Sequence, residues 1–164
     1  MNVEAQRIAV APIRKSIRVR ASRETAFKTF VEGMGEWWLK SHPLLKSPQK
    51  DVVIEQRDGG RWFEVGEDGS EQTWGRVLDW SPLDRLVLAW QLNADWTYDP
   101  GFETTVEVRF IAEGDQTLVE FEHRDLDRFG ERAAEVRGGY ESGMDGGWTE
   151  LLRMYEARAE AAAA

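Results

Sequence analysis

The chain has 164 residues and a formal net charge of -9, from 21 basic and 30 acidic side chains. This length suits a single domain, and the acidic balance argues against nucleic-acid binding, which depends on clustered Lys and Arg. The chain has no cysteine, which excludes disulfides, thiolate metal sites and a thiol nucleophile, so we expect a reducing, cytoplasmic location. No stretch has the pattern of a signal peptide or a membrane span.

The first part of the chain is predicted to contain one strand and two short helices. Residues 1–11 lack periodicity and are expected to form a flexible lead-in. From Ile13 onward, apolar and polar residues alternate, which predicts a strand with a basic outer face. Ser22 is the expected N-cap of the helix that follows. The two predicted helical segments, separated by glycines, are 23–32 and 36–39.

Six further strands are predicted in the middle of the chain. Short runs rich in aliphatic and aromatic residues there alternate with Gly, Asp and Pro, the residues typical of turns. The predicted strands are 52–56, 61–66, 72–80, 85–92, 103–112 and 117–124. Most neighbours are joined by short connections, which favours a meander of antiparallel hairpins.

The segment 138–160 is predicted to form a long helix on which the sheet packs. Its apolar residues recur at the i, i+3, i+4, i+7 spacing of one helical face. They are Met144, Trp148, Leu151, Leu152, Tyr155 and Ala159. Gly143, Gly146 and Gly147 are unusual in this place, because a glycine inside a helix costs about 1 kcal/mol relative to alanine. We expect a strand, a bend or a ligand near their backbone, and we expect residues 161–164 to fray.

The element order predicts an α+β architecture in a single domain over 12–160. Three segments also carry a resemblance to a known family: GGRWFEV at 59–65, WGRVLDWSPLDRLVLAW at 74–90 and GGWTELLRMYEARAE at 146–160. With the element order, they resemble the START-like (SRPBCC) helix-grip superfamily and, within it, the subfamily named after the activator of heat-shock protein 90 ATPase homologue (AHSA). The resemblance implies a curved antiparallel sheet wrapped around the C-terminal helix, with an apolar cavity between helix, sheet and the two short helices.

The resemblance also suggests classes of function. The superfamily includes lipid carriers, hormone receptors, polyketide cyclases, hydrolases and toxin-sequestering resistance proteins. Our leading hypothesis is therefore the binding of a small hydrophobic ligand, aromatic or lipid-like, without a cofactor. The alternatives are a cyclase or hydrolase type of enzyme, and an interaction protein that acts as a homodimer or co-chaperone. We do not expect chaperone binding, because the additional chaperone-binding domain of the eukaryotic activators has no counterpart in this sequence.

Few residues in the sequence have a pattern typical of catalysis. The phosphate-binding and nucleophile motifs GxGxxG, GxxxxGK[ST] and GxSxG are absent in the required context. The two histidines, His42 and His123, show no metal-site spacing, so we expect no metal. His123 is the candidate catalytic residue, because its phase directs it to the concave face of the sheet, where a neutral imidazole could bind a ligand or act as a general base. The alternative is a histidine at the sheet rim with satisfied hydrogen bonds.

The predicted cavity walls are mainly aromatic, since indole rings supply large, rigid surfaces. The candidate ligand-binding residues are Trp38, Trp74, Arg76, Trp90, Phe110, His123, Met144 and Trp148. Alternation puts Arg76 in phase with Trp74 and Trp80, where it would hold an acidic group if that face is inward; an outward, solvated side chain is the alternative. For the tryptophans, the alternative is core packing. The aromatic residues of the polar loop 96–102 are predicted to form a lid or a dimer contact.

Overall fold

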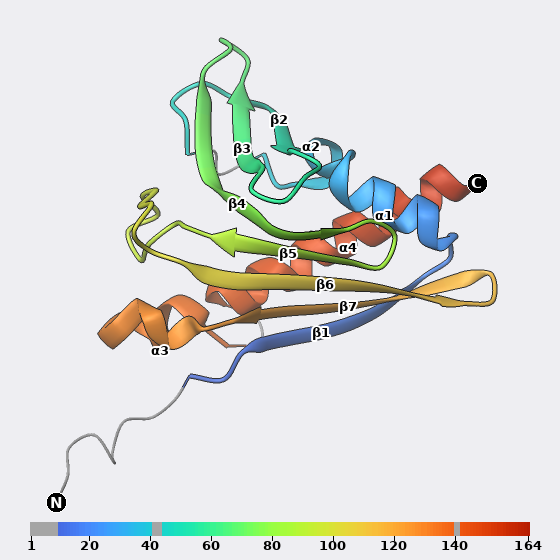
Figure 1. Cartoon of the computed structure of the whole chain (residues 1–164). Coiled ribbons are helices and arrows are strands. Elements are labelled where there is room, and N and C mark those ends of the chain that lie inside the picture. The colour runs from blue at the N-terminus through green and yellow to red at the C-terminus, as the bar shows by residue number, and fades with distance from the viewer. Residues whose placement is uncertain (1–9, 41–43, 140–141) are drawn as a thin grey trace, which may run out of the picture.

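The computed structural model of the chain describes residues 10–40, 44–139 and 142–164 (Figure 1). His42 and residues 1–9 of the predicted lead-in lie outside the described residues.

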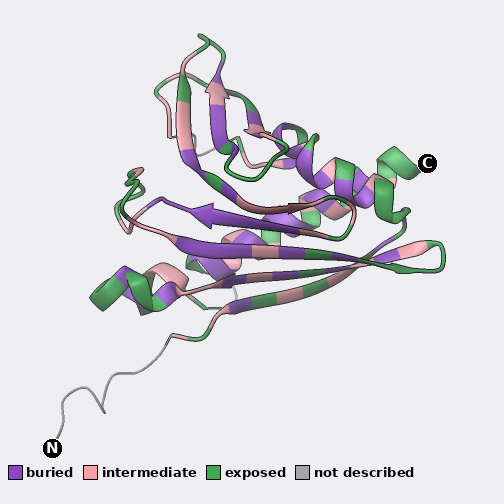
Figure 2. Cartoon of the chain, viewed as in Figure 1, coloured by how far each residue is buried: buried purple, intermediate pink, exposed green. Residues whose placement is uncertain are grey.

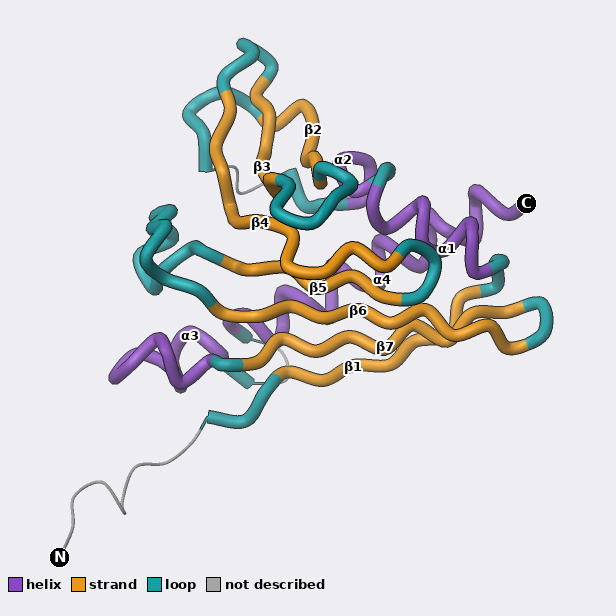
Figure 3. The backbone as a smooth tube through the Cα atoms, viewed as in Figure 1, coloured by secondary structure: helices purple, strands orange, loops and turns teal. Residues whose placement is uncertain are grey.

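A seven-stranded antiparallel sheet forms the body of the described structure. Its strands are β1 (Ile13–Val19), β2 (Gln49–Ile54), β3 (Arg61–Gly66), β4 (Glu71–Ser81), β5 (Arg85–Trp90), β6 (Thr104–Glu113) and β7 (Gln116–Arg124). Their order across the sheet is β1-β7-β6-β5-β4-β3-β2, so β2 to β7 form a meander and β1 pairs with β7 at its end. The sheet curls, and the hairpin of β2 and β3 rises away from the other strands (Figures 1 and 3). The predicted helix-grip fold is confirmed.

The helices lie on one side of the sheet and include two short elements that the sequence pattern did not predict. The helical elements are α1 (Arg23–Val31), α2 (Met34–Trp37), the 3-10 helix η2 (Leu126–Arg132), α3 (Ala133–Arg137) and α4 (Gly143–Ala163). Ser22 caps α1 as predicted, since its Oγ accepts a hydrogen bond from the Thr25 amide at 3.1 Å. The segment 126–137 is mostly polar and lacks helical periodicity in the sequence, and in the structure a positive φ at Gly130 interrupts it. None of the helices among the described residues is long and apolar enough to cross a membrane.

The start of α4 is fixed by a bend and by two ion pairs. The helix begins at Gly143, inside the predicted segment 138–160; Gly143 has a φ of 59°, and a Cβ there would lie 2.8 Å from a backbone atom. Asp145, in the first turn, pairs with Lys15 of β1 at 2.5 Å and with Arg137 of α3 at 3.3 Å. These contacts join the first turn of α4 to the sheet edge and to the preceding helix.

Strand β4 departs from strict alternation because it contains two β-bulges. Its register shifts at Trp74 against β3 and at Leu78 against β5. Each bulge changes which way the following side chains point. Trp74 is therefore buried and Trp80 packs against a residue of α1, whereas Arg76 is exposed. The predicted common face of these three side chains does not exist.

The core lies between α1, α4 and the concave face of the sheet (Figure 2). Phe110, a predicted cavity residue, lies in this core with its ring centroid 5.1 Å from that of Phe27 and 5.8 Å from that of Phe30. Tyr155 of α4 packs edge-to-face on Phe30 and donates a hydrogen bond from its hydroxyl to the Ala26 carbonyl at 2.7 Å. Burial raises the pKa of Tyr155, so its hydroxyl stays protonated and remains a donor. The second half of α4 therefore seals the core.

The Tyr155 hydroxyl gives a test of this packing. Tyr155→Phe should lower the free energy of unfolding by about 1–2 kcal/mol, because the buried Ala26 carbonyl loses its donor. Urea denaturation at pH 7 measures the change. The control is Tyr98→Phe, since the Tyr98 hydroxyl has no hydrogen bond to a described residue, and its stability should stay within about 0.5 kcal/mol of wild type. Equal effects of the two substitutions would contradict the assignment.

Candidate functional site

A cavity of about 550 Å³ lies beside the first half of α4. Its lining residues are Trp38, Leu39, Leu44, Trp90, Trp96, Gly143, Met144, Gly147, Trp148 and Leu151. None of these described lining residues carries a charged side chain. Its volume falls within the range of small-molecule sites, about 300–1,000 Å³. Within the described ranges, no cluster of three or more His, Asp or Glu residues is placed to hold a metal ion.

The helical wall of the cavity follows from the periodicity of α4. Met144, Gly147, Trp148 and Leu151 are spaced i, i+3, i+4, i+7 and share one face. Gly147 is a gap in that face, because a Cβ built there would meet no atom within 4 Å. The two glycines thus have different roles. Gly143 adopts the positive φ of the bend at the start of α4, and Gly147 leaves open a space that a side chain would fill.

The indoles of Trp38 and Trp90 form the wall opposite α4, and both contact the indole of Trp148 on the helix. Trp90 is the last residue of β5, and Trp38 follows α2 in an extended conformation. The ring of Trp148 meets Trp38 edge-to-face at 5.6 Å between centroids and Trp90 at 5.9 Å. Such edge-to-face pairs favour fixed relative orientations. The wall is therefore a rigid aromatic surface.

Trp96 forms the exposed rim of the cavity. It lies in the loop between β5 and β6, is 52% exposed, and has a left-handed backbone with a φ of 59°. Its ring centroid lies 6.0 Å from that of Trp90. The neighbouring Asp95 pairs with Arg132 of η2 at 2.6 Å, which ties this loop to the helices that the sequence did not predict.

A smaller compartment of about 50 Å³ adjoins the cavity and shares four of its lining residues. The compartment is lined by Trp38, Leu44, Trp74, Trp90, Leu92 and Trp96. The bulge in β4 turns Trp74 toward this space, where its ring centroid lies 5.0 Å from that of Trp38. Tryptophans therefore dominate both spaces.

His123 is completely buried and does not line the cavity. Its Nδ1 accepts a hydrogen bond from Trp148 Nε1 at 3.2 Å, and its Nε2 lies 2.8 Å from Thr104 Oγ1. Burial lowers the pKa of His123 to about 3, so the imidazole is neutral near pH 7. Because Nδ1 is an acceptor, we assign the proton to Nε2, which donates to Thr104. Both ring nitrogens are engaged, and the histidine holds the indole of Trp148 in place.

The structure brings together five of the eight predicted ligand-binding residues. Those that line the cavity or its compartment are Trp38, Trp74, Trp90, Met144 and Trp148. The other three lie elsewhere. Phe110 lies in the core and His123 lies behind Trp148, while Arg76 is exposed and pairs with Glu103 at 2.7 Å.

Six residues that line the cavity were not among the predicted ligand-binding residues. They are Leu39, Leu44, Trp96, Gly143, Gly147 and Leu151. The unusual glycines are a usable signal, and so is the position of Leu151 on the helical face of Trp148. Leu39 ends the predicted helical segment 36–39 and Leu44 lies outside any periodic segment, so no pattern marked either as a cavity residue. Trp96 was predicted as a loop aromatic with a lid or dimer role, and it lines the cavity.

The lowered pKa of His123 predicts a pH dependence of stability. In the unfolded chain the imidazole titrates near its ordinary value of about 6.5, whereas the folded state does not bind that proton until about pH 3. The free energy of unfolding should therefore decrease as the pH falls below about 6.5, by at most about 1.4 kcal/mol per pH unit from this group. His123→Gln should remove this component between pH 6.5 and 4.5 in urea denaturation, and His42→Gln should retain it. Parallel pH profiles for wild type and His123→Gln would refute the assignment.

Comparison with known proteins assigns the chain to a family. Residues 20–160 match the family described as Activator of Hsp90 ATPase homolog 1-like protein. No match was found among curated protein sequences.

Two solved structures are similar in sequence as well as in fold. CalC, a self-sacrificing resistance protein from Micromonospora echinospora, is 36% identical, with 93% of this chain and 96% of CalC covered and a TM-score of 0.69. Txn09, an anthrahydroquino-gamma-pyrone synthase, is 32% identical, with 92% of this chain and 97% of Txn09 covered and a TM-score of 0.63. The Aha1 dimer from Colwellia psychrerythraea is 15% identical, with 92% of this chain and 97% of that chain covered and a TM-score of 0.61, and so it shares the fold alone. The family match over most of the chain shows that this protein belongs to the Activator of Hsp90 ATPase homolog 1-like family, within the helix-grip superfamily.

Proposed function

We propose that the protein binds a small hydrophobic molecule with a flat aromatic frame in the cavity beside α4. The aromatic lining of the cavity carries this proposal: four tryptophans, Met144 and three leucine side chains surround a space of about 550 Å³. Indole faces pack well on flat ring systems, and methionine adapts to irregular ligand shapes.

The two relatives above 30% identity support this proposal. Txn09 is named as the synthase of an anthrahydroquino-gamma-pyrone, and a fused ring system of that type has the flat shape that the tryptophan walls suit. CalC is a resistance protein, which is compatible with a role in binding a small molecule. Both relatives match this chain over more than nine tenths of its length.

Catalysis on the bound molecule is the second candidate, and the synthase Txn09 favours it. The described lining of the cavity, however, contains no titratable side chain. His123, the predicted general base, is neutral, buried and hydrogen-bonded through both ring nitrogens. These features support binding and orientation of a ligand more than acid–base chemistry by His123.

Gly147 allows a test that separates binding from folding. Gly147→Leu should place its side chain in the cavity without a backbone clash, because no atom lies within 4 Å of the added Cβ. We expect wild type to bind 9-methylanthracene with saturable quenching of tryptophan fluorescence. The leucine variant should bind at least about tenfold more weakly, with no loss of thermal stability, since leucine is the better helix former.

The matched control is Glu150→Leu, which introduces the same side chain at an exposed position of α4. It should bind the probe as wild type does. Absence of saturable binding to wild type, or equal affinities for wild type and the Gly147 variant, would refute the proposed site.

Substitution of Trp96 can distinguish a role in ligand binding at the cavity from a role in dimer formation. We propose that Trp96 covers part of the bound ligand, because it lines the cavity while 52% of it remains exposed. Trp96→Ala should weaken binding of 9-methylanthracene by about 1 kcal/mol or more and leave the sedimentation velocity of the protein unchanged. A variant with wild-type affinity and an altered oligomeric state would instead assign Trp96 to a subunit contact.

A further inference from the structure

The small compartment at the end of the cavity has the composition of a cation site. Four tryptophans and two leucines line it, and its volume is about 50 Å³. That volume exceeds the roughly 15 Å³ needed to hold one water molecule, so it can admit a group as small as an ammonium. The faces of indole rings attract cations, and tryptophan does so more strongly than tyrosine or phenylalanine.

A buried carboxyl group lies directly behind this aromatic wall. Glu64, in β3, is completely buried, and its Oε1 accepts hydrogen bonds from Trp74 Nε1 at 3.0 Å and from the Leu44 amide at 2.9 Å. Both donors belong to residues that line the compartment. Trp74 and Leu44 therefore hold the carboxyl group against the compartment wall.

The second oxygen of this carboxyl group has no partner. Among the described residues, nothing forms a hydrogen bond with Glu64 Oε2, and the same is true of both polar atoms of the Gln49 amide. Gln49 lies on the neighbouring strand β2, opposite Gly66 and thus close to Glu64 along the ladder. Burying polar groups without hydrogen bonds is unfavourable, and such groups are rare in folded proteins. This corner of the described structure therefore holds an unpaired carboxyl oxygen and an unpaired amide group.

We propose that the compartment binds a protonated primary or secondary amine carried by the aromatic ligand, with Glu64 as its counter-ion. This inference rests on the proposed binding function and specifies the chemical class of the ligand. The indoles of Trp38, Trp74, Trp90 and Trp96 surround the ammonium group, and the carboxyl group of Glu64, behind Trp74 and Leu44, supplies the opposite charge. The attraction acts even across one layer of side chains, because the buried surroundings screen charges weakly. Among the described residues, no positively charged side chain lines either space to oppose it.

The test compares three probes of nearly equal shape: 9-methylanthracene, 9-(hydroxymethyl)anthracene and 9-(aminomethyl)anthracene at pH 7. Wild type should bind the aminomethyl compound at least about tenfold more tightly than the methyl compound, with the hydroxymethyl compound between them. Glu64→Gln should lose most of the preference for the amine and bind the methyl compound as wild type does. This variant should fold, because the glutamine carbonyl can still accept both hydrogen bonds that Oε1 receives.

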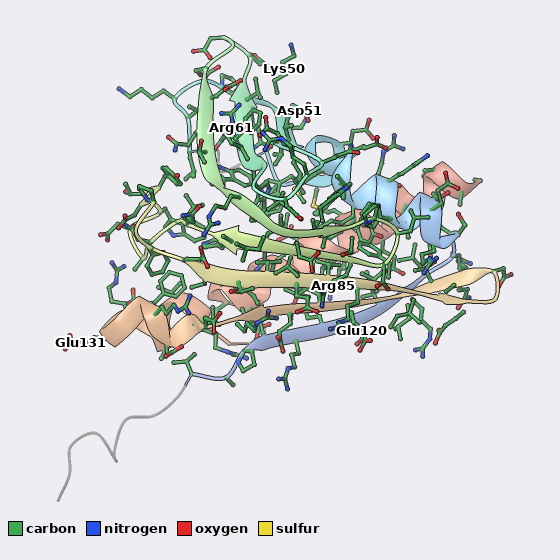
Figure 4. All side chains as sticks on the ribbon, viewed as in Figure 1. Lys50, Asp51, Arg61, Arg85, Glu120 and Glu131 are labelled. Carbon is green, nitrogen blue, oxygen red and sulfur yellow. The ribbon has the colours of Figure 1, made fainter. Side chains whose placement is uncertain are left out.

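The control for net charge is Glu120→Gln, since Glu120 is an exposed residue of β7 that is labelled in Figure 4. It should keep the full amine preference. Equal affinities of wild type for the three probes would overturn the amine proposal and leave the aromatic cavity standing, whereas failure of all three to bind would overturn both. An amine preference that survives in Glu64→Gln would refute the role of the carboxyl group.

Discussion

The apolar face of α4 must be covered along its whole length, and the arrangement of the other elements follows from how that is done. Around Tyr155, α1 and the sheet cover the helix directly, with edge-to-face aromatic contacts and a hydrogen bond to α1. Around Trp148 the cover consists of indoles from Trp38 and Trp90, and Gly147 contributes no side chain. One continuous helical face therefore closes the core at one end and borders a cavity at the other.

A short chain of neutral polar groups keeps the cavity wall in place. Trp148 donates to His123, His123 donates to Thr104, and the Thr104 hydroxyl lies 3.4 Å from the Trp90 carbonyl. The chain joins α4 to β7, β6 and the end of β5. Because the imidazole carries no charge, this network is compatible with complete burial. The sequence suggested His123 as a catalytic residue, and the structure places it in this network, hydrogen-bonded to the indole of Trp148.

Much of the fold could be predicted because its signals are local and periodic. The alternation of β1, the Ser22 cap and the apolar stripe of α4 each follow from the spacing of a few residues, and the order of elements led to the architecture. The bulges in β4 could not be predicted, since they depend on the partner strands, and they alone decide that Trp74 is inward and Arg76 outward. Likewise, the sequence could predict five of the residues that line the two spaces, because they are large aromatic residues or belong to the apolar face of α4. Leu44 and Glu64 meet only through tertiary contacts that leave no pattern in the sequence.

Gly147 couples two properties that are usually separate. At this one position, any side chain except that of proline would strengthen the central helix and, at the same time, shrink the cavity, because the space beside the backbone is open. The protein thus has a long helix with a weak point next to the cavity. A molecule that occupies this volume binds the folded state alone, so its binding free energy adds to the stability of the fold. In this architecture, occupancy of the cavity and resistance to unfolding rise together.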